Sequence, residues 1–390
     1  MAALNNLISQ CDKFMATNGS QHSANQVRYL ANMSTLLFSV PAGKGHAVSK
    51  PAAFEEELRF LSGLGEGQLR EYLDLADAHH VTVRTIQIVQ ASAPSYGYRD
   101  IVDRLQVPLS IEQKRIQNAL KFLNMICQEL EKAGCPVTVI KSLDHWPDLG
   151  GDLDLYSSGD KDVVISVFKS RFGAELEPQS WGDRLANKWN FRIPGLAELV
   201  ECHVKWLGQT GEQVALASRL EKRRITRDIA GYTFPVPAPE ERIVVSTLQR
   251  MYRHFYFRLC DVVNIANLLR NQAVDFSELK KSADSGSVWP GVATLLVIVC
   301  DYVASYGGEP IHLPADVLRS ARSNGKRTFV NQKFLRIPMV PEAAELYTKQ
   351  MLRISAQGDV RGLLRLSLLP ALATAAFVGY KLTGSDKGIW

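Results

Sequence analysis

The sequence predicts a mixed α+β protein, with a small mixed β-sheet and its flanking helices lying between N-terminal and C-terminal helical regions. Apolar residues recur with helical spacing between residues 54 and 76 and between residues 116 and 130. Strand-like stretches cluster between residues 136 and 206, and helical patterning returns after residue 240. We therefore expect an N-terminal helical region at 1–108, an α/β core at 109–235 and a C-terminal helical domain at 236–390.

The composition is that of a globular, mildly basic protein. The chain has 390 residues, of which 46% are hydrophobic and 22% charged, and a formal net charge of +5. This length suits two or three domains, and this balance of residues argues against extensive disorder. The charge permits an anionic ligand such as a nucleotide but does not require nucleic acid.

The six cysteines are scattered and form no CxxC pair, a pattern typical of buried free thiols in a reducing compartment. The first ten residues lack a basic segment that leads into an apolar run, so we expect no secretory signal and a cytoplasmic location.

Residues 366–380 are almost wholly apolar. They fall short of the roughly 20 residues that a spanning helix needs and contain Pro370. We interpret them as a buried helix, with membrane contact as the alternative.

The N-terminal region is expected to be a small helical bundle. Residues 54–61 and 69–76 have helical spacing of apolar positions and are separated by a glycine-bearing turn at 62–67. No chemical motif is recognised in residues 1–108. The sequence therefore assigns no function to this region.

The core is expected to begin with a helix at Ser110, because residues 110–113 form a capping box. Its apolar stripe ends at Gly134, and a β-branched strand follows at 136–140. The later elements of the core are an amphipathic segment and two strands that meet near a Pro-Gly turn, at residues 163–172, 189–193 and 199–206.

The C-terminal region is expected to be entirely helical. A proline-rich stretch at 233–240 is interpreted as the linker that leads into it. Long helical patterns then follow at residues 241–270, 276–284 and 288–303.

Three carboxylates form the candidate metal site. Asp152 and Asp154 are one residue apart on a predicted strand, so their side chains point to the same face. Glu201, in the alternating stretch 200–204, can supply a third carboxylate from a neighbouring strand. Three inward carboxylates would repel strongly unless a cation lies between them, and Mg²⁺ or Mn²⁺ suits such ligands. A strand edge with solvated carboxylates is the alternative interpretation.

Cationic and hydroxyl side chains near these carboxylates are candidates for binding phosphate. Lys141 and Ser142 follow the strand that precedes the paired aspartates; a lysine at a strand end and a plain N-cap are the alternatives. Lys188, Arg192 and Lys205 lie on or next to the two later strands, where cations could meet a triphosphate. Ordinary charge on a strand face is the alternative for these three.

Several other polar groups allow two interpretations. His203 alternates with Glu201 along its strand, but a structural histidine is preferred over a ligand. Residues 219–227 carry five basic side chains, for which a solvated helix face is preferred over an anionic partner such as RNA. Residues 252–258 combine aromatic and cationic side chains, suited to packing or to contact with a base or acceptor. Residues 319–336 carry six basic residues and no acidic one, and form a second candidate patch.

Taken together, these motifs resemble the polymerase β-like nucleotidyltransferase superfamily and, within it, the bacterial uncharacterised nucleotidyltransferase family. The resemblance covers roughly residues 112 to 305. Its matching segments are Ile140-Lys141-Ser142, Asp152-Leu153-Asp154, Val200-Glu201-Cys202-His203, and Leu248 to His254 with Asp261. Ser142 stands where the family usually has glycine, and the arginine often found just before the paired aspartates is absent.

The resemblance implies a metal-dependent nucleotidyltransferase that moves a nucleoside monophosphate from an NTP, such as ATP, to an acceptor hydroxyl. Asp152 and Asp154 would hold Mg²⁺ (or Mn²⁺), Glu201 would complete the site and orient or deprotonate the acceptor, and Lys141 with Ser142 would hold the outer phosphates. The sequence does not specify whether the acceptor is a small molecule, a protein or RNA.

Two alternatives to this activity remain. The first is a degenerate, non-catalytic module that binds a nucleotide or a partner, which the serine in the glycine position suggests. The second is an RNA-modifying toxin or antitoxin component, which the two basic runs suggest.

Overall fold

The protein is described here by a computed structural model, which covers residues 21–39, 51–271, 274–321, 329–331, 333–337, 344–372, 374–375 and 378. The chain divides into two compact units, and the segments of each are not contiguous in sequence. Unit 1 consists of Met1–Gln113, Gln249–Ala273 and Pro290–Leu346, and unit 2 of Lys114–Leu248, Val274–Trp289 and Tyr347–Trp390. The three consecutive regions expected at 1–108, 109–235 and 236–390 stay a prediction.

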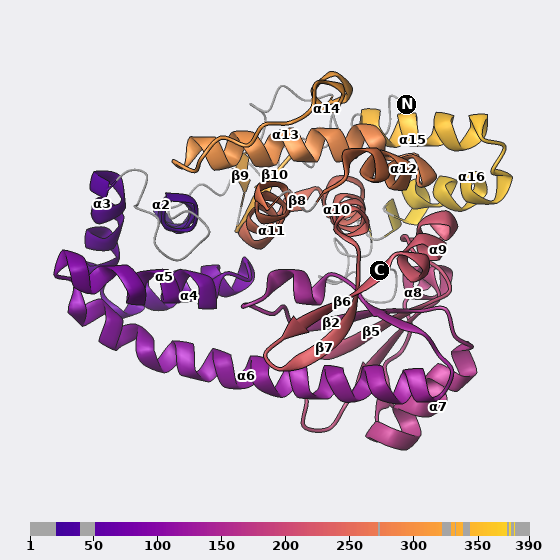
Figure 1. Ribbon diagram of the computed structural model, residues 1–390, viewed down its shortest axis with the longest axis horizontal. Coiled ribbons are helices and arrows are strands. Elements are labelled where there is room, and N and C mark those ends of the chain that lie inside the picture. Colours follow the sequence, from indigo (N-terminus) through magenta and orange to yellow (C-terminus); the bar gives the residue numbers. More distant parts are fainter. Residues whose placement is uncertain are drawn as a thin grey trace. The chain divides into compact units, whose positions relative to one another are not determined.

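Unit 1 is mainly helical (Figure 1). Its helices are α2 (Gln21–Ser39), α3 (Pro51–Ser62), α4 (Glu66–Ala78), α5 (Thr82–Ser92), the 3-10 helix η1 (Ala93–Tyr96), the first part of α6 (Arg99–Lys132), the π-helix η3 (Leu248–His254), α11 (Leu259–Arg270), most of α13 (Trp289–Ser305) and α14 (Ala315–Ser320). Helix α2 contacts α3, α4 and α5. Helices α3 and α4 confirm the two helices expected at 54–61 and 69–76.

A small antiparallel sheet in unit 1 was not expected. Its strands are β8 (Tyr256–Phe257), β10 (Phe334–Arg336) and β9 (Phe329–Asn331), in the order β8-β10-β9. The continuous helix predicted at 241–270 is therefore wrong, and the C-terminal region is not entirely helical. The backbone of Phe255 has a φ of 54°, in the left-handed region that ends helices, and strand β8 begins at the next residue.

Unit 2 contains a five-stranded mixed sheet, which confirms the predicted α+β class. Its strand order is β1-β2-β5-β4-β3, with β2 and β5 parallel and the other pairs antiparallel. The strands are β1 (Val137–Val139), β2 (Asp152–Ser157), β3 (Glu175–Leu176), β4 (Lys188–Arg192) and β5 (Leu199–Val204). The antiparallel pairing of β4 and β5 confirms the expected connection through the Pro-Gly turn.

The remaining elements of unit 2 are mostly helical. They are the second part of α6, the 3-10 helix η2 (Ser142–His145), α7 (Lys161–Phe172), α8 (Trp181–Ala186), α9 (Val214–Lys222), the hairpin strands β6 (Arg224–Ile229) and β7 (Tyr232–Pro237), α10 (Pro239–Thr247), α12 (Phe276–Ser285), most of α15 (Ala344–Ala356) and α16 (Val360–Ser367). Helix α7 begins where the Asp160 carboxylate accepts hydrogen bonds from Asp162 N (2.9 Å) and Val163 N (3.4 Å). It ends at Gly173, whose φ is 59°.

Two expected local elements, the linker at 233–240 and the helix start at Ser110, are wrong. The proline-rich stretch at 233–240 is largely strand β7, which among the described residues pairs with β6 alone, so its prolines need not donate to another strand. The helix expected to begin at Ser110 is instead continuous from Arg99 through Pro108 to Lys132. Apolar residues on both sides of Pro108 are buried with one helical spacing, at Ile101, Leu105, Leu109, Ile116 and Leu120.

The C-terminal apolar stretch differs from the buried helix predicted at 366–380. Leu366 is buried, but Leu368 and Val378 are exposed, and part of the stretch lies outside the described residues. Over the part of the chain that the structure describes, no helix has the length and apolar character needed to cross a membrane.

The described cysteines are free thiols, as expected. Four are buried, namely Cys127, Cys135, Cys202 and Cys260, and Cys300 is partly buried. Cys11 lies outside the described residues.

Candidate functional site

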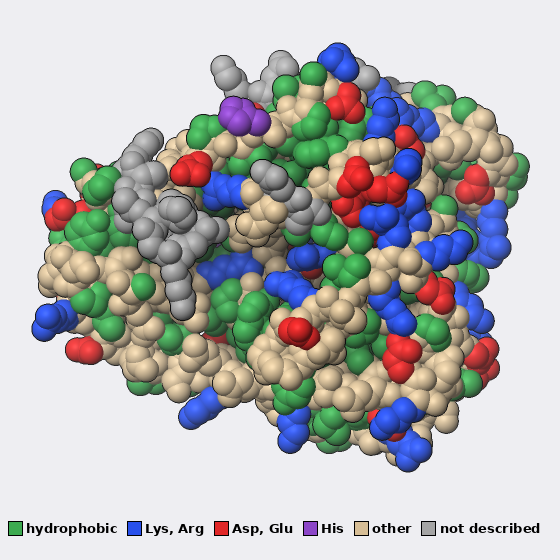
Figure 2. Space-filling view, viewed as in Figure 1, with side chains coloured by type: hydrophobic (Ala, Val, Ile, Leu, Met, Phe, Trp, Pro, Cys, Tyr) green, Lys and Arg blue, Asp and Glu red, His purple; other side chains and the backbone are tan. Residues whose placement is uncertain are grey.

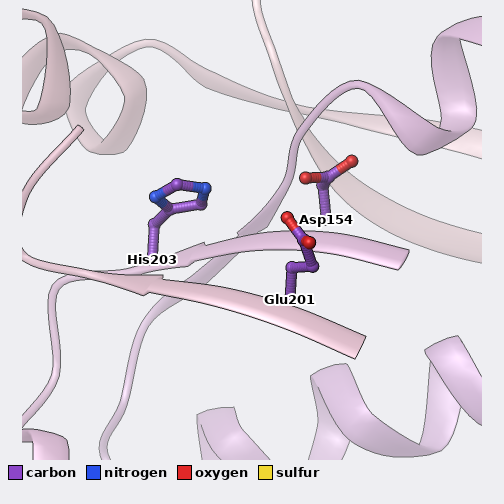
Figure 3. A group of neighbouring side chains, drawn as sticks. All are labelled: Asp154, Glu201 and His203. Atoms are coloured by element: carbon purple, nitrogen blue, oxygen red, sulfur yellow. The ribbon is translucent and has the colours of Figure 1, made fainter. Parts of the chain in front are cut away.

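The carboxylates predicted from the sequence come together on one face of the sheet in unit 2. Strands β2 and β5 run parallel in a register that pairs Asp154 with Glu201 and Tyr156 with His203. Because side chains alternate along a strand, Asp152 and Asp154 share a face of β2. Figure 3 shows Asp154, Glu201 and His203 rising from the same face of the two strands. The register thus places carboxylates from two distant segments side by side.

Asp154, Glu201 and His203 fit a divalent cation. One ligand atom from each of these residues lies within 4.8 Å of the others, a spacing close to the roughly 4 Å that separates opposite ligands of a Mg²⁺ or Mn²⁺ ion. Carboxylate oxygens suit Mg²⁺, and an added imidazole nitrogen shifts the preference toward transition metals such as Mn²⁺. His203 was expected to be structural, so its place in this group was missed.

Two lysines are paired with the carboxylates. Lys141 Nζ forms an ion pair with Asp154. Lys188 Nζ lies 2.9 Å from Asp183 Oδ1 and 3.2 Å from Glu201 Oε1, and its side chain is only 9% exposed. Together with Asp152, this face of the sheet carries four carboxylates and two ammonium groups. The excess negative charge is what a divalent cation would neutralise.

The crowding of these carboxylates shows in their pKa values. Loss of hydration, with the charges of Glu201 and Asp154, raises the pKa of Asp152 to about 6, although the residue is exposed at the start of β2. Burial raises the pKa of Asp154 and Glu201 adds to the increase, while the Lys141 ammonium opposes it. Both shifts favour the protonated form, so a bound cation would relieve an unfavourable concentration of charge.

The segment between β1 and η2 is fixed to strand β2 by Ser142. Its hydroxyl donates to the carbonyl oxygen of Asp152 (3.2 Å) and accepts from the amide of Asp154 (2.7 Å), and Ser142 is buried. Lys141 has a φ of 60°, a left-handed conformation that non-glycine residues adopt rarely. The bonds of Ser142 favour a positioning role over direct contact with phosphate, which stays a prediction.

An arginine from helix α6 holds the segment that leads into β2. Arg115 Nη2 donates to the carbonyl of Leu149 (2.8 Å), and Nη1 donates to the carbonyl of Gly150 (3.2 Å). Arg115 also pairs with the buried carboxylate of Glu198, just before β5. One side chain therefore ties together the approaches to both strands of the site.

Two of the predicted phosphate-binding residues lie apart from this group. Arg192 Nε is paired with Glu177 Oε1 at 2.8 Å, and the arginine side chain is 62% exposed. Lys205 is exposed beyond the end of β5, about 13 Å along the strand direction from Glu201 at 3.3 Å per residue. Their proposed contacts with phosphate have no geometric support and stay predictions.

Sequence reasoning missed Asp183, Asn190 and Arg115. Asp183 belongs to a capping box with Ser180 at the start of α8, and that pattern predicts a helix start but not a contact with Lys188. Asn190 pairs with Glu201 in the β4–β5 register and contacts Asp183 Oδ2 at 3.4 Å. Arg115 lies in the middle of a long helix. Only tertiary structure brings these residues to the site.

The basic cluster at 219–227 is largely neutralised within unit 2. Arg219 and Arg223 form ion pairs with Glu240, Glu241 and Glu278 at 2.8 to 3.2 Å. Figure 2 shows acidic and basic side chains intermingled where α9, α10 and α12 lie. The expected helix face is also interrupted, because β6 begins at residue 224. Of the second basic patch, residues 322–328 and 332 lie outside the described part of the chain.

Comparison with known proteins gives a match to a protein family. A family described as "Uncharacterised nucleotidyltransferase" matches residues 66–299; the match begins within α4, earlier than the expected residue 112. No match to a curated protein was found. The crystal structure of an antigenic nucleotidyltransferase-like protein from Paracoccidioides brasiliensis is similar over 52% of this chain and 97% of its own, with 16% identity and a TM-score of 0.33. A similarity this distant carries no functional argument.

Proposed function

Because this chain belongs to the uncharacterised nucleotidyltransferase family, we propose that it transfers a nucleoside monophosphate from an NTP to an acceptor hydroxyl, with a divalent cation bound at Asp152, Asp154 and Glu201. The observation that supports this most strongly is the in-register pairing of Asp154 with Glu201 on parallel strands. Lys141 and Lys188 compensate these two carboxylates only in part, because Asp152 and Asp183 add two further negative charges beside them. A bound cation would neutralise the remaining charge.

The donor set determines what the cation contributes. When bound, Mg²⁺ or Mn²⁺ would neutralise charge on the phosphates and favour ionisation of the attacking hydroxyl. Asp152 and Asp154 present their carboxylates from one strand, and Glu201 presents its own from the next. Glu201 is also the residue to which we assign the orientation or deprotonation of the acceptor. His203 is a further ligand candidate.

The lysines are assigned to the phosphates. Lys141 and Lys188 lie beside the carboxylates and are among the least exposed charged residues of the site. An ammonium group there can exchange a carboxylate partner for a phosphate oxygen as the cation and the NTP bind. Ser142 acts through its bonds to β2, which hold Lys141 in place. Arg192 and Lys205 receive no role in this proposal.

A second candidate function has one observation in its favour. Lys141 and Lys188 already supply counter-charges to Asp154 and Glu201, as expected of a degenerate site that needs no metal. Such a protein would bind a nucleotide or a partner without catalysis. The neutralised cluster at 219–227, in contrast, removes one of the two features that suggested an RNA-modifying component.

The test is a labelling experiment with a matched control. The purified protein is incubated with each α-³²P-labelled NTP, Mg²⁺ or Mn²⁺ and a fractionated cell extract, and the label is located on small molecules, protein or RNA. Asp154→Asn should lower transfer at least about 100-fold, since it removes a charge that acts on the transition state. Asp160→Asn should leave transfer unchanged, because asparagine also caps α7 at that exposed position.

Two outcomes would contradict the proposed nucleotidyl transfer at these carboxylates. Equal transfer by the wild type and Asp154→Asn would remove the carboxylates from the mechanism. Calorimetric binding of an NTP with no pyrophosphate release in any fraction would favour the binding module instead. In that case Asp154→Asn should alter the metal dependence of binding and nothing else.

A further inference from the structure

A second group of charged side chains lies entirely within unit 1. The guanidinium carbons of Arg250, Arg258 and Arg336 lie 5.4, 5.9 and 5.7 Å from the ring centre of Tyr256. They come from the π-helix η3, from the start of α11 and from β10. Three elements thus direct positive charge to one aromatic ring.

The ring is held in place by its neighbours. Tyr256 stacks on Phe334 with centroids 4.4 Å apart and planes 19° from parallel, and β8 and β10 pair Tyr256 with Arg336. Arg258 also lies 5.8 Å from the Phe334 ring. Cation–π contacts of this kind hold guanidinium groups close to the rings.

The positive charge exceeds its local compensation. Asp261 lies 2.7 Å from Arg250 Nε and also accepts from the backbone amide of Arg258 (2.8 Å). No other carboxylate pairs with these three arginines in the ion pairs of the described residues. The cluster therefore carries about two positive charges in excess.

Several of the N–H donors are buried without a partner. Nη1 of Arg250 and Nε of both Arg258 and Arg336 have no hydrogen-bond acceptor among the described residues, and Arg250 is only 1% exposed. Burial lowers the pKa of Arg336. Unsatisfied buried donors and uncompensated charge are costly, and an anion supplied from outside would satisfy both.

The backbone supports a functional interpretation. The element before Tyr256 is π-helical, and Phe255 adopts a left-handed φ of 54°. π-Helical turns and strained backbone positions concentrate at functional sites. Both features displace Arg250, Tyr256 and Arg258 from the positions that a continuous α-helix would give them.

We propose that Arg250, Arg258 and Arg336 form a binding site for a phosphate group. The excess of two charges matches a phosphate dianion, and guanidinium N–H groups bind phosphate oxygens in pairs. Tyr256, Arg258 and Arg336 are only partly buried, so the cluster keeps some surface that an ion in solution can reach. Phe334 already stacks on the Tyr256 ring and three guanidinium groups surround it, so an oxyanion fits better than a stacked nucleobase. The ligand is inorganic phosphate, pyrophosphate or the phosphate of a nucleotide.

The deciding probe is inorganic phosphate on the full-length protein without divalent cations, because nucleotides are also expected at the carboxylate site. Calorimetry should detect phosphate binding by the wild type. Arg258→Gln and Arg336→Gln should each weaken it at least about tenfold, and Arg336→Lys should weaken it too, because lysine lacks the planar fork. Arg59→Gln, an exposed arginine of the same unit, is the control and should bind as the wild type does.

Pyrophosphate and ATP then distinguish the sources. If pyrophosphate or ATP binds more tightly than inorganic phosphate, and the arginine variants lose this binding, that larger molecule is the better ligand. Phenylglyoxal labelling adds a site-specific measure, since phosphate should protect Arg258 and Arg336 but not Arg59. The proposal is overturned if the wild type binds none of the three probes up to about 10 mM, or if the folded variants bind as tightly as the wild type. Neither result bears on nucleotidyl transfer.

Discussion

Lys188 is buried between two carboxylates in unit 2, and its ammonium group contributes to the charge balance of the candidate site. It lies 2.9 Å from Asp183 and 3.2 Å from Glu201. The sequence predicted Lys188 as a candidate phosphate-binding residue at the strand near 189–193, but not its ion pair with Glu201. Its second partner could not be predicted either, because Asp183 reaches Lys188 only through the packing of α8 against β4.

Replacement of Lys188 should make the free energy of unfolding depend on whether a divalent metal is present. Lys188→Met should lower the free energy of unfolding by about 3 kcal/mol in EDTA, because it leaves two largely buried carboxylates without their counter-charge. Mn²⁺ should restore part of the loss. Urea unfolding at pH 7 with and without Mn²⁺ measures both effects. Arg192→Met, on the same strand but exposed, should change stability by less than about 0.5 kcal/mol. If Lys188→Met loses the same free energy of unfolding in EDTA and in Mn²⁺, the result would contradict a metal site at these carboxylates.

His79 in unit 1 should make stability depend on pH. Its Nδ1 accepts from the amide of Leu259 (2.9 Å) and its Nε2 donates to the carbonyl of Lys333 (2.6 Å), so the ring is neutral. Burial lowers its pKa from 6.5 to about 4. Between these values the unfolded chain binds a proton and the folded protein does not. The contribution of His79 is therefore present above pH 6.5 and is lost as the pH falls toward 4.

The size of this effect can be measured with a variant. The pKa difference corresponds to about 3 kcal/mol at pH 4. His79→Gln can keep one donor and one acceptor but does not titrate, so its free energy of unfolding should fall less steeply between pH 6.5 and 4.5. Urea unfolding at several pH values gives the slope. His312→Gln, at an exposed position, is the control, and equal slopes for His79→Gln and the wild type would refute this account.

At the scale of elements, the strands of the site followed from alternation and the helices from apolar spacing. The errors occurred where two local signals competed. The capping box at 110–113 predicted a helix start, but burial of apolar residues on both sides of Pro108 favours one continuous α6. The proline-rich β7 and the short β8 form through pairing with β6 and β10. Such pairing depends on distant residues, which single-sequence patterns do not report.

The contacts among α9, α10 and α12 give an element-level prediction. The carboxylate of Glu241 is fully buried and lies 2.9 Å from Arg219 and 3.1 Å from Arg223. Glu241→Gln should lower the free energy of unfolding by about 2 kcal/mol, less than a fully buried pair would lose, because both arginines are partly exposed. Lys281→Gln, which removes an exposed pair with Glu278, should cost under about 0.5 kcal/mol. Thermal and urea unfolding of both variants and the wild type measure these two differences in stability.

At the scale of the whole molecule, each unit is assembled from separate segments of the chain. The fold class and the presence of flanking helical regions could be predicted, because they depend on local pattern. The grouping of the chain segments into two units could not be predicted, because it depends on tertiary contacts. Residues 249–273 belong to unit 1, and the adjacent residues 274–289 belong to unit 2. The sequence-based boundaries near 108 and 235 fall inside α6 and β7.

Limited proteolysis tests this arrangement. Thermolysin should cut neither at 105–112 nor at 232–237 in the native protein, because helical and paired backbone resists cleavage. The same bonds should be cut after heating, which controls for sequence preference. Mass spectrometry of the first fragments identifies the sites. Early native cleavage at either position would instead support three consecutive domains.

The parallel pairing of β2 with β5 has a consequence for folding kinetics. Asp154 and Glu201 are neighbours in the sheet, but α7, β3, α8 and β4 separate them in the chain. Contacts between segments so far apart in the chain close slowly. A nascent or partly folded chain therefore has no complete carboxylate site, and the onset of cation binding during refolding should coincide with the last cooperative step and not with early helix formation.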